Sequence, residues 1–215
     1  MSPPATDRAE SRAVNGRTPG QRGQATRQAL LEATRDLLED FGYRDLRVVD
    51  IARRAGTSAA TFYQYFEDVP GAILQLATDL ARDAGTGLVA VVAGADWRHD
   101  AVGAARQLVD AAMAVWERDR ALLLAVSLAA GEGDARFRQV RYDLTEASVR
   151  ALRGVVAEGA GSDPISALAT ARALFAMLDS IGAQAGDLGA PNLELRGAAA
   201  AAIGAAVGAD AVAAG

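Results

Sequence analysis

Alanine limits what this chain can fold into more than any other residue, because it accounts for 51 of the 215 positions. It is the best helix former among the amino acids. The aromatic residues that favour strands make up only 5% of the chain. The composition therefore predicts an all-α fold.

Missing residue types exclude several kinds of chemistry. The chain has no Cys, which excludes disulfide scaffolds, thiolate zinc sites, iron–sulfur clusters and cysteine nucleophiles, and is compatible with a reducing cytoplasm. The only histidine, His99, is too few for a two-histidine metal site. The sequence contains neither a Gly-rich phosphate loop nor a GxSxG motif. We therefore expect no enzymatic activity, no metal site and no cofactor.

Apolar residues at helical spacing, separated by Gly, Pro and capping residues, predict about nine helices and no strand. The expected helices cover residues 26–41, 48–55, 59–65, 69 to the early nineties, 97–116, 121–130, 134–157, 164–185 and 193–207. We expect four parts, namely a disordered arm with four arginines (1–23), a small helical domain (24–68), a larger helical domain (69–208) and a disordered tail (209–215).

Membrane segments are not expected. Residues 1–24 contain no apolar core of a signal peptide, and no stretch reaches the about 20 uninterrupted apolar residues of a membrane-spanning helix. Residues 197–215 come nearest, but Ala and Gly are only weakly apolar. We expect a cytoplasmic protein without a membrane partner.

The small domain contains a helix-turn-helix pattern. An amphipathic helix ends at Gly42, a helix of about two turns is closed by Gly56, and Thr57 and Ser58 cap a third helix over residues 59–65. Residues 1–66 carry ten arginines and eight acidic residues, whereas residues 67–215 have a net charge of −7. A basic segment on an acidic body favours a DNA-binding module attached to a different domain.

Between Thr26 and Leu76 the sequence resembles the tetracycline-repressor-like (TetR) family of bacterial transcription regulators. The resemblance is carried by Phe41-Gly42-Tyr43, Asp50-Ile51-Ala52, Ala55-Gly56, Thr61-Phe62-Tyr63 and Tyr65-Phe66. It implies a DNA-binding domain at residues 24–68 and an effector-binding and dimerisation domain at residues 69–208. It further implies a ligand-responsive regulator, most often a repressor, that binds a palindromic double-stranded DNA operator as a homodimer.

By the same resemblance, the last two long helices pair with their twins in the dimer. The small side chains at residues 198–202 and at Gly204 would allow helices to approach closely. The helix that starts at Val69 would join the DNA-binding domain to the body and transmit the signal.

The expected DNA contacts lie on and around the second helix of the motif. Gln64 suits adenine, Tyr63 suits a thymine methyl group or a phosphate, and the hydroxyl groups suit phosphate oxygens. The full set of expected contacts is Arg22, Arg27, Arg47, Thr57, Ser58, Ala59, Ala60, Thr61, Tyr63, Gln64 and Tyr65.

Some positions depart from the family pattern. Val69 stands where members commonly carry a phosphate-binding Lys, and Glu67 and Asp68 precede it. Ala59 and Ala60 occupy positions where a polar or basic residue often contacts bases. The alternative function is therefore a helical interaction protein that has lost DNA binding.

The larger domain has apolar stretches at residues 109–116 and 121–130 that could wall a cavity. The expected pocket residues are Trp97, Met113, Trp116, Ala125, Phe137, Tyr142, Phe175 and Asp179, and the polar groups that could orient a ligand are Tyr142, Asp179, Gln184 and His99. This predicts a mainly hydrophobic small molecule held by one or two hydrogen bonds.

Overall fold

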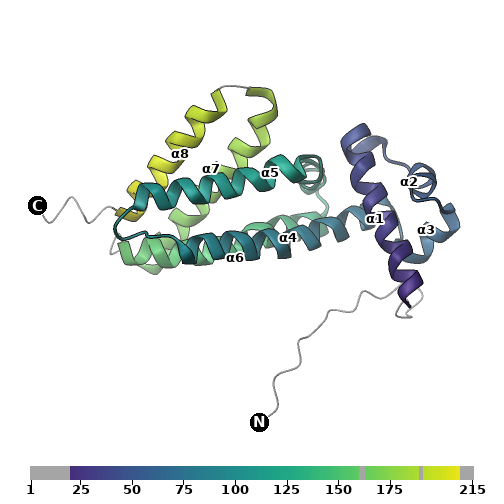
Figure 1. The fold of residues 1–215 in the computed structure, drawn as a ribbon, viewed down its shortest axis with the longest axis horizontal. Helices are drawn as coiled ribbons and strands as arrows, with labels where there is room; N and C mark the ends of the chain where they lie inside the picture. Colours follow the sequence, from purple (N-terminus) through teal and green to yellow (C-terminus); the bar gives the residue numbers. More distant parts are fainter. Residues whose placement is uncertain (1–19, 160–162, 189–190, 209–215) are drawn as a thin grey trace, which may run out of the picture. The chain divides into compact units, whose positions relative to one another are not determined.

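The computed structural model describes residues 20–159, 163–188 and 191–208. Over these residues the chain forms eight α-helices and one short 3-10 helix, and no strand (Figure 1). The prediction of an all-α fold is confirmed. Most of the expected arm and the whole expected tail lie outside the described residues.

The helices form two compact units, and the boundary between them in the sequence lies between Leu76 and Ala77. The first unit contains α1 (Gln21–Phe41), the 3-10 helix η1 (Tyr43–Asp45), α2 (Val48–Arg54), α3 (Ala59–Tyr65) and the start of α4 (Val69–Gly94). The second unit contains the rest of α4, α5 (Ala101–Gly131), α6 (Ala135–Gly159), α7 (Pro164–Leu188) and α8 (Pro191–Gly208).

The first helix begins earlier than expected. α1 starts at Gln21, ahead of Thr26, so Arg22 and Gly23 belong to a helix and not to an arm. The added residues are largely exposed, and they include Gln and Arg, which are good helix formers. The spacing of apolar residues predicted a start at Thr26, because this spacing reveals only those turns of a helix that contribute side chains to a core.

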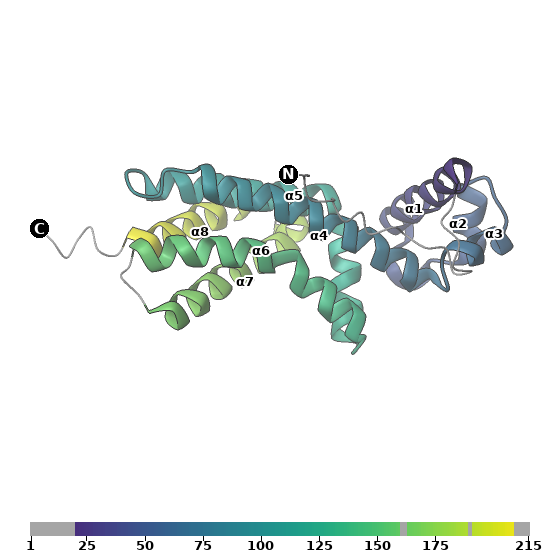
Figure 2. The same ribbon diagram turned by 90° about the horizontal axis from the view of Figure 1, so that it is seen from below.

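One helix fewer than expected forms in the second unit. α5 contains residues 101–116 of the helix expected at 97–116 and all of the helix expected at 121–130, and it has a kink at Asp119 with φ −119° and ψ 26°. The two halves of α5 run in different directions on either side of this residue (Figure 2). Asp119 is buried and accepts a hydrogen bond from Nε of Arg118 at 2.6 Å. The charged run at residues 117–120 therefore marks a kink rather than a loop.

The core of the first unit joins its short helices to α1. The most buried side chains include Leu30 of α1, Ile51 of α2 and Phe62 of α3, each fully inaccessible to solvent. α2 packs against both α1 and α3. This core fixes the orientation of α3 and therefore decides which of its side chains face outward.

The second unit is built from α5, α6, α7 and α8, which all pack against one another, with Gly85 of α4 lying against Ala147 of α6. Within the described residues, the stretch long and apolar enough to span a membrane is Pro164–Ala185 in α7, and part of the stretch 197–215 lies outside the described residues. Arg172 and Asp179 interrupt this stretch. Packing of α7 on three other helices is typical of a core helix of the same composition.

Candidate functional site

The turn between α2 and α3 is set by local backbone hydrogen bonds. Gly56 has φ +65°, a conformation that residues with a Cβ rarely adopt. The N–H of Thr57 donates to the carbonyl of Ala52 at 2.8 Å, and the N–H of Gly56 donates to that of Arg53 at 3.1 Å. This pair of bonds is the Schellman motif, which ends a helix sharply. The chain can therefore start a new helix only a few residues later.

Ser58 starts α3 as its N-cap. Its Oγ accepts a hydrogen bond from the N–H of Thr61 at 3.1 Å, which satisfies a donor that the helix itself leaves free. Phe62 then points into the core, with its ring 5.5 Å from that of Phe66. The next two side chains, Tyr63 and Gln64, are exposed. The exposed face of α3 thus consists of an aromatic hydroxyl and an amide beside small residues.

Asp68, one of the two acidic residues near this face, is the N-cap of α4. The carboxylate of Asp68 accepts a hydrogen bond from the N–H of Gly71 at 2.7 Å, as a helix N-cap does. Its charge therefore stabilises the first turn of α4. Glu67 is exposed.

The three arginines expected to contact phosphate occupy different positions in the first unit. Arg22 is exposed on the first turn of α1. The guanidinium group of Arg27 lies 5.5 Å above the ring of Phe66, in cation–π range. Arg47 is the extended residue before α2 and is exposed.

The remaining expected DNA contacts belong to one continuous segment. Thr57, Ala59, Thr61 and Tyr65 are partly exposed, and Ser58 and Ala60 are exposed. A helix of this size fits the major groove of DNA, where amides and hydroxyl groups can bond to base edges and apolar groups can touch the thymine methyl. The first unit therefore carries the geometry of a helix-turn-helix, with α3 as its exposed second helix.

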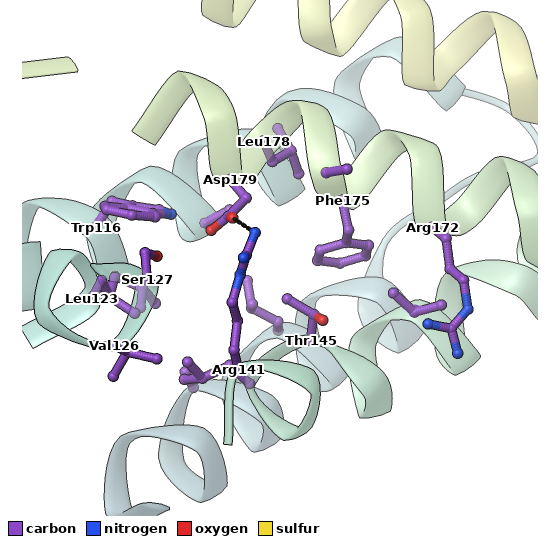
Figure 3. Close-up of a pocket in the computed structure, with 17 residues that line it drawn as sticks. Trp116, Leu123, Val126, Ser127, Arg141, Thr145, Arg172, Phe175, Leu178 and Asp179 are labelled. Carbon is purple, nitrogen blue, oxygen red and sulfur yellow. Dashed lines mark hydrogen bonds and ion pairs between the residues drawn. The ribbon is translucent and has the colours of Figure 1, made fainter. Parts of the chain in front are cut away.

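The second unit contains a cavity of about 200 Å³ between α4, α5, α6 and α7 (Figure 3). Most of its wall is apolar: Ala84 and Leu88 from α4, Ala112, Val115, Trp116, Leu123 and Val126 from α5, Leu144 and Val149 from α6, and Phe175, Ala176 and Leu178 from α7. Such a wall favours a ligand with a hydrophobic body.

The polar groups of the cavity are Ser127, Arg141, Thr145, Arg172 and Asp179. Nη2 of Arg141 lies 3.5 Å from Oδ2 of Asp179, so a side chain of α6 reaches across to α7 (Figure 3). Burial raises the pKa of the Asp179 carboxyl above its usual value, and the charge of Arg141 opposes this rise.

The second cavity arginine, Arg172, is bound to α6. Its Nη2 donates to Glu146 at 2.9 Å and to the Tyr142 hydroxyl at 3.3 Å, and its guanidinium group lies 5.2 Å above the Tyr142 ring. The pKa of Glu146 is lowered, first by the hydrogen bond from Tyr142 and then by the charges of Arg172 and Arg150.

The expected pocket residues are divided by the structure. Trp116, Phe175 and Asp179 line the cavity. Met113 lies instead in a separate hollow with Glu117, Arg120 and Gly182, and Ala125 and Phe137 are buried elsewhere in the core.

The other expected polar or aromatic residues also lie outside the wall of this cavity. Tyr142 is 42% exposed, and its hydroxyl accepts a hydrogen bond from Arg172, which lines the cavity. Trp97 donates its indole N–H to the carbonyl of Val92 at 2.7 Å. His99 faces Asp96 at 3.0 Å, and Gln184 donates to Ser180 on its own helix.

Sequence reasoning missed Arg141 and Arg172, because a basic residue on a helix is normally a solvated surface group. The available signal was position: Arg172 interrupts the apolar stretch of α7, as Asp179 does. Nothing local distinguishes Arg141 from the other arginines of α6.

An exposed second helix of a helix-turn-helix, in a chain whose other unit contains a mainly apolar cavity, is typical of a DNA-binding regulator with a ligand-binding domain. Two family models match the sequence. The model of bacterial regulatory proteins of the tetR family matches residues 30–68, and the model of the tetracyclin repressor-like C-terminal domain matches residues 88–205, more than half of the chain. The chain belongs to the TetR family of transcriptional regulators.

Solved structures share this fold at low sequence identity. The fatty acid degradation regulator FadR from Bacillus halodurans is 16% identical, with a TM-score of 0.67, over 87% of this chain and 97% of that one. FadR from Bacillus subtilis in complex with stearoyl-CoA is 16% identical (TM-score 0.66; 84% and 97%). FadR from Thermus thermophilus, a repressor in complex with lauroyl-CoA, is 17% identical (TM-score 0.61; 84% and 92%). No curated protein sequence matches the chain.

Proposed function

We propose that this protein is a ligand-responsive transcriptional repressor that binds a palindromic operator as a homodimer and is released from it by a mainly hydrophobic small molecule. The observation that carries the proposal is the presence, in one chain of the TetR family, of an exposed α3 and of an apolar cavity in the second unit. Members of the family are soluble cytoplasmic DNA-binding regulators, and we propose the same location here.

The exposed faces of α7 and α8 support a homodimer. Ala198, Ala201, Ala202 and Ala205 are exposed at the spacing of one helix face, and Ile165, Ala169, Ala173 and Ala176 do the same on α7. The two helices pack against each other, so the two faces can form one weakly apolar surface that consists mostly of small side chains. Size-exclusion chromatography with light scattering tests this surface, and a monomer at micromolar concentration would contradict the proposal.

Part of the small-residue run serves the fold of one chain instead. Ala199 and Ala200 are buried, and a Cβ added at Gly204 would lie 3.1 Å from Val102 of α5. Gly204 therefore allows α8 to approach α5 within the second unit. We propose only the exposed alanines as dimer contacts.

We propose α3 as the recognition helix, with Tyr63 and Gln64 as base contacts and the hydroxyl and arginine side chains as phosphate contacts. The two-fold symmetry of a dimer predicts half-sites about 34–36 Å apart, or somewhat more. Gln64→Ala should cost roughly 1–3 kcal/mol of binding free energy and relax the sequence preference. Gln107→Ala, an exposed glutamine in the second unit, is the matched control.

The test is selection of bound fragments from genomic DNA, followed by fluorescence anisotropy with the selected operator. Wild-type protein that selects no sequence would favour the alternative, a helical interaction protein. The exposed Glu67 and the absence of a Lys at Val69 are the observations that favour this alternative. A Gln64→Ala variant with unchanged affinity and sequence preference would show that the recognition face is assigned wrongly.

The effector proposal rests on the cavity wall. Two fold neighbours were solved in complex with stearoyl-CoA and with lauroyl-CoA, which supports an effector with an apolar chain. To release the operator, the ligand must bind the DNA-incompetent arrangement more tightly than the competent one. We propose α4 as the element that transmits the change, because it supplies Ala84 and Leu88 to the cavity and begins in the first unit.

A further inference from the structure

The ion pair inside the cavity is held loosely. The 3.5 Å between Nη2 of Arg141 and Oδ2 of Asp179 is long beside the about 2.7–2.9 Å of a good charge-assisted hydrogen bond. Arg141 extends across the cavity to meet Asp179, between Trp116 and Ser127 on one side and Phe175 and Thr145 on the other (Figure 3). A ligand that fills both sides must displace or replace this contact.

The charges that line the cavity favour an anion. The cavity is lined by two arginines, Arg141 and Arg172, and by one carboxylate, Asp179, whose partner is Arg141. Glu146 lies behind Arg172, but it also accepts a hydrogen bond from Arg150 at 3.0 Å, so one carboxylate serves two arginines. The cavity and its edge therefore carry an excess of positive charge.

Asp179 is the group that an entering anion would displace from Arg141. The charged groups on the elements around it are Arg141 from α6 and Arg172 from α7, while the wall residues from α4 and α5 are uncharged. Burial already raises the pKa of its carboxyl while Arg141 is its partner. A carboxylate that loses its cation in such a place binds a proton more readily.

We propose that the effector is a compact carboxylic acid whose carboxylate replaces Asp179 as the partner of Arg141, while Asp179 takes up one proton from solvent. This inference rests on the proposed function, because it names the ligand class of the same pocket. The apolar body of the acid lies against Trp116 and Phe175. The cavity of about 200 Å³ is smaller than the about 300–1,000 Å³ of sites for drug-sized ligands, so the body is a short aliphatic chain or a single ring.

The charge count excludes the opposite ligand. An organic cation would compete with Arg141 for Asp179 and leave the Arg141 guanidinium group without a partner. A neutral alcohol could hydrogen-bond to Arg141, but it would gain no charge-assisted bond and would cause no proton uptake.

The experiment is calorimetric titration of the full-length protein with octanoate and with 1-octanol at pH 7, in phosphate and in Tris buffer. Octanoate should bind at least about tenfold more tightly than 1-octanol, because a charge-assisted bond is worth about 1.5–3 kcal/mol. The difference in heat between the buffers should show net proton uptake with octanoate alone. Equal affinities for the two compounds, or no binding of octanoate, would overturn the inference.

Three variants sharpen the test. Arg141→Gln should remove the preference for octanoate, and Arg141→Lys should restore part of it. Asp179→Asn should tighten octanoate binding about tenfold and abolish the proton uptake, because no carboxylate then competes for Arg141. Arg153→Gln, an exposed arginine of α6 outside the cavity wall, should change neither quantity. Unchanged octanoate binding in a folded Arg141→Gln protein overturns the inference.

Operator binding separates this inference from the proposed function. Octanoate should release the selected operator from the wild-type protein. If octanoyl-coenzyme A releases the operator and octanoate does not, the proposal of a hydrophobic effector stands, and the inference that the effector is a carboxylic acid is overturned. Octanoate binding that follows the pattern above, in a protein that selects no DNA, would overturn the proposed function alone.

Discussion

The two units present their functional groups in opposite ways. In the first unit, the proposed DNA contacts from Arg47 to Tyr65 follow one another along the chain and face solvent. In the second unit, the cavity is walled by four helices, and its central contact joins Arg141 to Asp179 across them. A surface made from one segment is set by local signals, whereas a cavity between helices depends on how distant segments pack.

The electrostatic conditions differ in the same way. Tyr63 and Gln64 are exposed to water, so their polar groups need no partner within the protein. Asp179 is partly withdrawn from water and needs one, which Arg141 supplies weakly. The proposed DNA contacts therefore need no rearrangement within the first unit, whereas the proposed ligand must displace a contact in the second.

The largest expected effect tests whether the units are independent. Phe62 and Phe137 are both fully buried, the first under α3 and the second in α6. Phe62→Ala should destabilise the first unit by about 3–5 kcal/mol and abolish DNA binding, while octanoate binding persists. Phe137→Ala should do the reverse. Denaturant unfolding with both binding assays measures this, and simultaneous loss of both activities in either variant would show that the units do not act separately.

The same contrast explains how much the sequence revealed. The α2–α3 turn at Gly56 and the Ser58 cap were both predicted, because each depends on residues within one or two turns. For the cavity, the sequence predicted a mainly apolar wall but only some of the residues that form it. Trp116 and Phe175 were expected in its wall and line it, but Ala125 and Phe137 have the same apolar character and point elsewhere.

The reason is geometric. Helical spacing indicates which residues are buried, but it does not say whether they meet another side chain or an empty space. The kink at Asp119 shows the same limit, since it redirects the half of α5 that contains Leu123 and Val126 of the cavity wall. The partner of Asp179 could not be chosen among the arginines of α6 before α6 and α7 were placed together.

A glycine pair tests how tightly the cavity wall is packed. A Cβ added at Gly182 of α7 would overlap the indole ring of Trp116, whereas one added at Gly154 of α6 would meet nothing within 4 Å. Gly182→Ala should cost about 1–3 kcal/mol and weaken octanoate binding, because the displaced ring forms part of the cavity. Gly154→Ala should instead stabilise the protein by about 0.5–1 kcal/mol. Thermal unfolding of both variants tests this prediction. Equal changes in stability would mean that the indole ring of Trp116 moves aside at no cost.

The cap of α3 allows stability and DNA contact to be separated. Ser58→Ala removes the acceptor for the N–H of Thr61 and should cost about 1 kcal/mol of unfolding free energy in the first unit. Ser58→Asp keeps a good N-cap and should keep the stability, but it adds a negative charge where a phosphate is expected and should weaken binding to every DNA sequence. Undiminished DNA binding by Ser58→Asp would place Ser58 outside the interface.

The smallest expected effects come from one buried hydroxyl group in each unit. Thr34 and Ser148 are both fully buried, but Oγ1 of Thr34 donates to the carbonyl of Leu30 at 2.8 Å, while Oγ of Ser148 has no hydrogen-bond partner among the described residues. Thr34→Val should therefore destabilise the protein by up to about 1 kcal/mol. Ser148→Ala should stabilise it by a similar amount, because it removes an unsatisfied group and adds a better helix former. Urea unfolding should show midpoints shifted in opposite directions with unchanged m-values. If Ser148→Ala lowers the midpoint instead, the hydroxyl group of Ser148 has a partner, and the contrast with Thr34 does not hold.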